Sequence, residues 1–338
     1  MNKLFKKRNL EEVEAKLARL EEEVGNIEPA FFPDGRQGYV GESGKLVIAF
    51  HSWQEVWPFQ EGLAPIEIAD RFGFIDKSGE VIIPCIWRAV SGFNEGLSRV
   101  EDDRGLEGVI NKCGDIVIPC QWNHIGSFND GLAVVNDANN KWGYINRQGE
   151  VVVPCKWSQA VGFEKGYAKV KGDNNLYGVI DTNGNEVVPC QWEGLEILED
   201  SLFRVKNSEG LWGVIDINGK FVMPCQWEYV GWSGDNLNRV KNENKLFGFA
   251  DNSGKLVIPC QWTLSSHFYE GLAAVRDSNK KYGFINESGD LVIPYQWEDV
   301  LHFKDGVCEV ADAYVGWYKI DKKGRIVEGS TFSKNRDM

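Results

Sequence analysis

Apolar and polar positions recur in one fixed order along most of this chain, with a period of 35 residues. Each period contains a short aromatic and β-branched run around a glycine, a polar turn of the form Asx-x-x-Gly, and a second apolar run ending in Pro-Cys-x-Trp. A fixed period of this length indicates a repeat architecture. The glycine marks the same point in successive copies: Gly38, Gly73, Gly108, Gly143, Gly178, Gly213, Gly248 and Gly283.

One copy shows which elements the pattern predicts. Residues 142–153 read as two short strands joined by a turn at 146–149, whose glycine suits a positive φ, so they predict a β-hairpin. Residues 167–171 alternate apolar and polar side chains and predict a third strand. The segment 157–163 is either a fourth short strand or an irregular corner.

The repeated Gly and Pro exclude helices of the length that helical repeats need. The sequence therefore predicts an all-β fold of tandem antiparallel β-hairpin repeats, with eight copies and a partial ninth. We favour an open, solenoid-like array over a closed, propeller-like ring, because nine units exceed the usual ring and 35 residues are few for a four-stranded blade. The end copies also depart from the pattern, as the caps of a linear stack do: Ala49-Phe50 and Pro294-Tyr295 replace Pro-Cys, and residues 326–328 lack Pro and Trp.

The first 27 residues follow a different pattern, with apolar side chains at alternating spacings of three and four. These positions are Leu10, Val13, Leu17, Leu20, Val24 and Ile27. They predict a short amphipathic helix that stops near Gly25 and must bury its stripe. The stripe is expected to form a weak coiled coil between copies, to dock on a partner, or to pack on the first repeat as a cap. Residues 28–37 predict a linker, 38–327 the repeat array and 328–338 a tail.

Charge and hydropathy narrow the range of partners. The chain has 338 residues and a formal net charge of −13. This acidity disfavours nucleic acid and anionic membranes, because phosphate binding needs a basic face. The sequence contains no run of about 20 apolar residues, so it predicts no membrane-spanning helix. The basic start of the chain is not followed by the apolar stretch of a signal peptide. We therefore expect a cytoplasmic protein.

Cysteine is also part of the repeat. Six of the eight cysteines directly follow the proline: Cys85, Cys120, Cys155, Cys190, Cys225 and Cys260. We expect reduced thiols in the cytoplasm, and neither these six nor Cys113 and Cys308 have the spacing of a metal site. The sequence predicts a regular row of mostly buried, unligated side chains and no cofactor.

Two motifs connect the repeat to a known family. Lys141-Trp142-Gly143 and Leu211-Trp212-Gly213 recur as variants with Tyr or Phe in other copies, and Phe-x-x-Gly-Leu-Ala-x-Val fills residues 128–135 and 268–275. In both motifs the chain resembles the WG (KWG) repeat of bacterial proteins, over about residues 38–327. Local departures stand at Glu107, Ser201 and Asn236. The resemblance implies a β-rich repeat protein without shared catalytic residues.

Tryptophan forms a second row, with one residue in each copy: Trp53, Trp87, Trp122, Trp157, Trp192, Trp227, Trp262 and Trp297. A side chain fixed at one point of every repeat favours packing between repeats. An exposed row would instead suit stacking on sugars or quaternary ammonium groups, so a carbohydrate or cell-envelope binding module is the alternative function. No catalytic triad, phosphate loop or paired-carboxylate motif stands out, and His51, His124, His267 and His302 share no spacing. We expect no enzyme activity.

Positions that differ between copies are better candidates for recognition, because the repeat does not dictate them. The clearest of them lie just after each tryptophan, and we predict partner-binding residues there. They are Asn123, His124, Ser158, Gln159, Glu193, Glu228, Tyr229, Glu298 and Asp299. The sequence thus predicts a non-catalytic scaffold for protein–protein interaction and leaves the partner unidentified.

Overall fold

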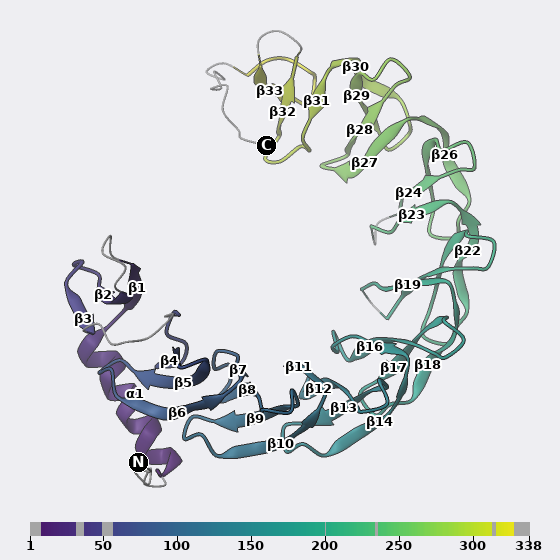
Figure 1. Cartoon of the computed structure of the whole chain (residues 1–338). Helices are drawn as coiled ribbons and strands as arrows, with labels where there is room; N and C mark the ends of the chain where they lie inside the picture. Colours follow the sequence, from purple (N-terminus) through teal and green to yellow (C-terminus); the bar gives the residue numbers. More distant parts are fainter. Residues whose placement is uncertain are drawn as a thin grey trace. The chain divides into compact units, whose positions relative to one another are not determined.

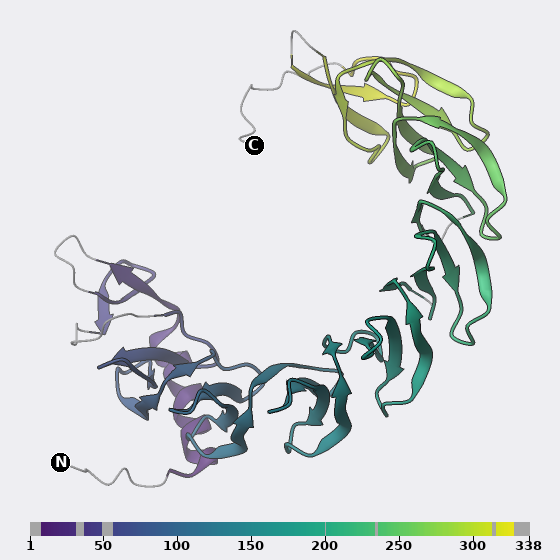
Figure 2. The same ribbon diagram turned by 45° about the vertical axis from the view of Figure 1, so that its right-hand side comes forward.

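The computed structural model describes residues 8–31, 37–48, 57–199, 201–233, 236–312 and 316–327. Over these residues the chain forms one helix and many antiparallel strands, which confirms the all-β class of tandem hairpin repeats (Figures 1 and 2). It divides into two compact units, residues 1–173 with 181–185, and residues 174–180 with 186–338. Trp53, His51, the altered pair at 49–50 and the tail from residue 328 lie outside the described residues.

The elements follow one another with short connections. The first unit contains α1 (Leu10–Val24), β1 (Ile27–Phe31), β2 (Gln37–Gly41), β3 (Leu46–Ile48), β4 (Leu63–Ile68), β5 (Arg71–Asp76), β6 (Val81–Trp87), β7 (Ala89–Val90), β8 (Leu97–Glu101), β9 (Glu107–Asn111), β10 (Ile116–Trp122), β11 (His124–Asn129), β12 (Leu132–Asn136), β13 (Trp142–Asn146), β14 (Val151–Trp157), β15 (Gln159–Ala160) and β16 (Tyr167–Lys171).

The second unit begins with β17 (Tyr177–Asp181) and continues with β18 (Glu186–Trp192), β19 (Gly194–Ile197), β20 (Phe203–Lys206), β21 (Trp212–Ile215), β22 (Phe221–Trp227), β23 (Tyr229–Gly231), β24 (Asn238–Lys241), β25 (Phe247–Ala250), β26 (Leu256–Trp262), β27 (Leu264–Tyr269), β28 (Leu272–Arg276), β29 (Tyr282–Asn286), β30 (Leu291–Trp297), β31 (Asp299–Val300), β32 (Val307–Ala311) and β33 (Trp317–Asp321).

A complete repeat is an antiparallel sheet of four consecutive strands, as in β11-β12-β13-β14. In this sheet Ala133 of β12 pairs with Ile145 of β13. The segment after the tryptophan, which the sequence leaves open, forms the short first strand of each such sheet. It is six residues long in β11 and two in β15. Each four-stranded sheet therefore holds one more strand than the three that the sequence predicts clearly.

The recurring glycine is required by a close approach of two strands. The register between β13 and β14 shifts so that residues 154–156 face Gly143 alone. These residues bulge across the glycine, as extra residues do in a β-bulge. A Cβ on Gly143 would lie 2.5 Å from the carbonyl oxygen of Val153 and 2.8 Å from the nitrogen of Cys155. Only glycine avoids this collision, which explains why the residue recurs in every period.

Successive sheets are held together by their turns. The turn glycine Gly149 has a φ of 82° and lies against the preceding repeat, where its added Cβ would lie 3.2 Å from Ile118. In the turn between β11 and β12, the Asp130 carboxylate accepts a hydrogen bond of 2.8 Å from the backbone nitrogen of Gly166 in the following repeat. Within each unit the sheets therefore follow one another as in a solenoid, and hydrophobic side chains fill the space between them.

Helix α1 packs on the first two repeats of the same chain. Val13 and Leu17 are buried in one hydrophobic cluster with Ile82 of β6, and Leu20 is buried as well. Lys16 Nζ lies 2.5 Å from carboxylate oxygens of both Asp76 and Glu80. The stripe is thus covered within the chain, as in the cap alternative, and a coiled coil between copies would require the helix to leave this position.

Two boundaries differ from the predicted ones. The helix ends at Val24, where Gly25 has a φ of 68°, so Ile27 is not helical and Leu10 is exposed. Ile27 instead begins β1, which pairs with β2 inside the predicted linker 28–37. Its Pro29 pairs with Tyr39 as Pro65 pairs with Phe74 in the next repeat. The array therefore starts at β1, one strand earlier than the apolar pattern indicates.

We predict that Gly143→Ala destabilises the fold by about 1–3 kcal/mol, because the new methyl group meets backbone atoms that cannot move aside cheaply. Gly41→Ala is the matched control. It also lies in a strand, and its Cβ would make only an ordinary contact of 3.5 Å with Val47. Urea unfolding followed by tryptophan fluorescence measures both variants. Equal stabilities of the two would contradict the close approach.

We also predict that Leu17→Asp destabilises the first unit by about 3 kcal/mol or more, since it places a carboxylate in a hydrophobic cluster. Glu22→Ala, an exposed site on the same helix, should change stability little. The measurement is thermal unfolding followed by circular dichroism. A Leu17→Asp protein with unchanged unfolding would show that α1 contributes nothing to the fold.

Candidate binding surfaces

The predicted partner-binding positions lie at the junction between consecutive sheets, either just before the first strand of a sheet or at its first residue. Several of their side chains serve the fold. Asn123 Nδ2 donates to the carbonyl oxygen of Asp137 at 2.7 Å, and Ser158 Oγ donates to that of Gly172 at 2.8 Å. Thr263 occupies the same position and donates to the carbonyl of Asp277 at 3.1 Å. The side chain varies between copies, yet it ties the same junction to the same turn. Variation at this position therefore hides a shared structural role.

Some of the remaining candidates lie close to an oppositely charged or titratable side chain, and others are exposed without an ion pair. Glu228 forms an ion pair with Lys245, and Glu298 forms one with Lys281 at 2.5 Å. His124 Nδ1 lies 3.4 Å from Glu107. The exposed candidates without an ion pair in the described part of the chain are Gln159, Glu193 and Asp299. They lie at or just before the first strands of three different sheets, so the structure does not bring the predicted positions together into one site.

Tyr229 belongs to a cluster of arginine and aromatic side chains in the second unit. Arg239 Nη2 donates to its hydroxyl at 2.9 Å, and the guanidinium groups of Arg204 and Arg239 lie 5.5 and 5.2 Å from its ring centre. Arg204 also lies over Trp212, and Arg239 over Phe247. Burial alone would raise the pKa of Tyr229, but the two arginines lower it below its usual value.

The sequence reasoning overlooked these arginines. Arg204 and Arg239 occupy the same strand position as Arg99, and all three donate from Nη1 to a backbone carbonyl in the following sheet. The recurrence of arginine at a period of 35 residues is the signal that indicates this contact between repeats. Because their Nη1 donors are used inside the chain, the cluster stabilises the stack of sheets.

The tryptophan row is buried. The seven described members, from Trp87 to Trp297, are at most 9% exposed, so their rings cannot stack on a sugar or a quaternary ammonium group. The carbohydrate-binding alternative based on this row is therefore wrong. Trp262 Nε1 donates to the hydroxyl of Tyr295 at 2.7 Å, and Tyr295 stands where other repeats carry cysteine. The row thus serves packing between repeats.

The cysteines are free, but the prediction of buried side chains is only partly right. Cys308 is buried, whereas the six post-proline cysteines are half-buried. They lie in the bulged segment, so part of each side chain reaches the surface of the sheet. Burial raises the pKa of Cys85, Cys155 and Cys225 to about 11. Such thiols stay protonated at neutral pH and are poor nucleophiles and metal ligands.

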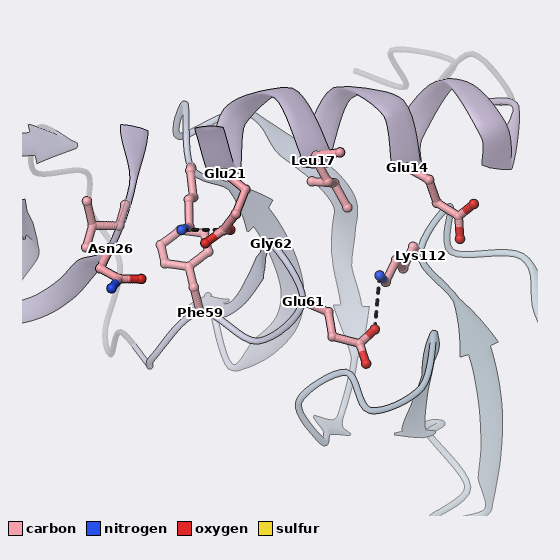
Figure 3. Close-up of a pocket in the computed structure, with 11 residues that line it drawn as sticks. Glu14, Leu17, Glu21, Asn26, Phe59, Glu61, Gly62 and Lys112 are labelled. Carbon is pink, nitrogen blue, oxygen red and sulfur yellow. Dashed lines mark ion pairs between the residues drawn. The ribbon is translucent and has the colours of Figure 1, made fainter. Parts of the chain in front are cut away.

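A cavity of about 470 Å³ lies between α1 and the turns of the next two repeats (Figure 3). Two ion pairs cross its walls: Lys77 with Glu21 at 2.8 Å and Lys112 with Glu61 at 3.0 Å. Lys77 Nζ also donates to the carbonyl of Gly25 at 2.6 Å, which ties the end of the helix to the second repeat. The Lys77 contacts therefore attach α1 to the array, and the Lys112–Glu61 pair links two repeats beside it.

The described residues contain no group of three or more His, Cys, Asp and Glu side chains that would hold a metal ion. Over the same residues, no helix is both long enough and apolar enough to cross a membrane.

Comparisons with known proteins agree with the repeat. The family model of the WG containing repeat matches eight segments, residues 38–71, 72–104, 108–142, 142–176, 177–210, 212–245, 247–281 and 282–311. No curated protein matches the chain.

Similar solved structures include the computationally designed Ika8 protein, which is 12% identical, with 81% of this chain and 94% of that chain covered and a TM-score of 0.33. BamB from Moraxella catarrhalis is 11% identical, with 86% and 95% covered and a TM-score of 0.27. Hsv2p from Kluyveromyces lactis is 9% identical, with 69% and 92% covered and a TM-score of 0.31. At these TM-scores no function is transferred.

We predict that Cys155 and Cys225 react with iodoacetamide about 100-fold more slowly in the folded chain than in urea. A pKa raised from 9 to about 11 lowers the thiolate fraction by that factor below pH 9. Mass spectrometry of the labelled peptides gives the rates.

The same shift has a consequence for stability. The folded state favours the protonated thiols, so their contribution is complete below about pH 9 and is lost as the pH rises towards 11. Rapid labelling of both cysteines in the folded chain at pH 8 would contradict the burial of their sulfur atoms.

Proposed function

The chain belongs to the family of WG-repeat proteins, and on this premise we propose that it is a non-catalytic scaffold that binds another protein. The proposal rests on the contrast between recurring residues, which pack the sheets, and exposed residues, which vary. Glycine, tryptophan and the Pro-Cys segment hold the sheets together, while exposed side chains change from one sheet to the next. Stacked repeats of this kind present extended surfaces that suit protein partners.

The distribution of polar groups supports the same function. The buried and half-buried arginines, lysines and carboxylates described above are paired with one another or with backbone carbonyls. The cysteine pKa values are raised, which is unfavourable for nucleophilic catalysis. The net charge of −13 favours a basic or neutral protein surface over nucleic acid. Free cysteines accord with a cytoplasmic location.

Self-association through α1 is not part of this proposal. The helix already buries Val13, Leu17 and Leu20 against its own repeats. A partner must therefore use other exposed positions, such as Gln159, Glu193 and Asp299, which are open in the structure.

Affinity capture from the native host tests the scaffold, with the tagged full-length chain as bait. We expect a partner protein at a stoichiometric level, whose binding to the purified chain is then measured by calorimetry. Glu193→Lys and Asp299→Lys alter exposed positions without touching the contacts between sheets, and at least one of them should weaken that binding. Glu228→Gln, within an internal ion pair, serves as a control. A bait that retains no stoichiometric protein contradicts the proposed function.

A further inference from the structure

The last strand of most repeats exposes apolar side chains on one surface, which we call the apolar edge, and β6 is an exception. Strands β10, β14, β18, β22, β26 and β30 share nearly the same alternation of exposed and buried residues. Their first residue and their proline are exposed throughout. In β14 these are Val151, which is 51% exposed, and Pro154, and Val152 between them is exposed too. In β10 Ile116 is 58% exposed.

Strand β6 differs because α1 covers it. Val81 and Pro84 are half-buried, and Ile82 is only 2% exposed. Ile82 shares a hydrophobic cluster with Val13 and Leu17 of the helix. The chain thus contains one occupied example of this edge, with an amphipathic helix as the occupant.

The contact also shows which charges accompany the apolar stripe. Glu80, the residue before β6, lies 2.7 Å from Arg8 Nη2 and 2.5 Å from Lys16 Nζ. Arg8 Nη2 also reaches the carbonyl oxygen of Val81 at 3.4 Å. The helix is therefore held by apolar residues on the strand and by a carboxylate that pairs with Lys16 and with Arg8, which precedes the helix.

The same combination recurs in the next two repeats without a helix on it. Asp115 precedes Ile116 in β10, and Glu150 precedes Val151 in β14. Further along the chain the pattern changes in three strands. Glu186 interrupts the exposed apolar side chains of β18, and lysines precede β22 and β26 at Lys220 and Lys255. The combination returns in β30 of the second unit, where Asp290 precedes the exposed Leu291. We call residues 115–119 and 150–154 the acidic strip.

We propose that the acidic strip is a docking surface for an amphipathic helix of a partner protein, with an apolar stripe flanked by Lys or Arg. This inference rests on the proposed scaffold function and gives the partner a chemical class. Apolar area and charge both favour this occupant, since α1 binds the equivalent edge in that way and the chain carries a net charge of −13. Strands β6, β10 and β14 all belong to the first unit, where α1 lies beside β6 (Figure 1).

The chain itself supplies substitutions that the fold accepts. Lysine stands at the position of Glu150 in three other repeats, as Lys45, Lys220 and Lys255. Glutamate stands at the position of Val151 in β18. Glu150→Lys and Val151→Glu should therefore preserve the sheet while removing the charge or the apolar contact. Lys220→Ala is the matched control at the equivalent position of the second unit.

The experiment measures fluorescence anisotropy of two labelled peptides on the full-length chain. The basic peptide has the sequence of residues 8–27 with Glu12, Glu22 and Glu23 replaced by lysine. The acidic peptide keeps these glutamates and has Lys16 and Arg19 replaced by glutamate. Both keep the same apolar stripe. We expect the basic peptide to bind at least about tenfold more tightly, and both Glu150→Lys and Val151→Glu to weaken it by about tenfold, whereas Lys220→Ala leaves it unchanged.

Three results would overturn the acidic strip: no binding of either peptide, equal binding of both, or binding of the basic peptide that neither strip variant affects. A dimer of the chain that Glu150→Lys dissociates would identify a second copy as the occupant and also overturn the proposal. If the strip fails while the chain still captures its native partner, the scaffold function stands. If the chain captures no partner, the scaffold fails whatever the peptides do.

Discussion

The close approach of two strands at the recurring glycine determines much of the rest of the structure. Residues 154–156 bulge across Gly143 and bring the two strands into close contact at this point. Trp157 is buried, while Val151 and Pro154 remain at the surface. Any Cβ at the glycine would collide with backbone atoms, so the residue must recur wherever the bulge does. One steric constraint thus explains why glycine recurs at this point of the repeat.

Residues that recur along the repeats make the contacts between sheets, so the side chains in these contacts are not available to bind another molecule. Turn glycines lie on aliphatic side chains of the preceding repeat, and arginines such as Arg239 donate to carbonyl groups of the following sheet. Helix α1 uses the same surface as a repeat edge, with Lys16 placed between Asp76 and Glu80. The exposed positions that differ between sheets are the ones that these contacts leave unused.

The sequence was sufficient for the features that depend on local pattern. The hairpins, their turns and the packing role of tryptophan follow from alternation, turn residues and the fixed period. Three features depend on contacts distant in sequence and were not predictable. β1 lacks the Val and Ile run of its counterparts, and only its pairing with β2 reveals it as a strand. The covering of Ile82 by α1 joins residues about 65 positions apart. The role of Asn123 and Ser158 was hidden because different side chains make the same contact with a turn carbonyl.

The central claim is that one edge of the repeat is built to receive a helix and that α1 is its occupant in the second repeat. Native-state hydrogen exchange of the full-length chain, resolved by residue, tests this claim most directly, because amides that open together exchange with the same free energy. The account predicts that the central amides of α1, around Leu17, are as protected as those of β6 around Ile82 and are lost with them in mild denaturant. Rapid exchange along α1 while β6 stays protected would contradict it, since the helix would then not be held on the edge.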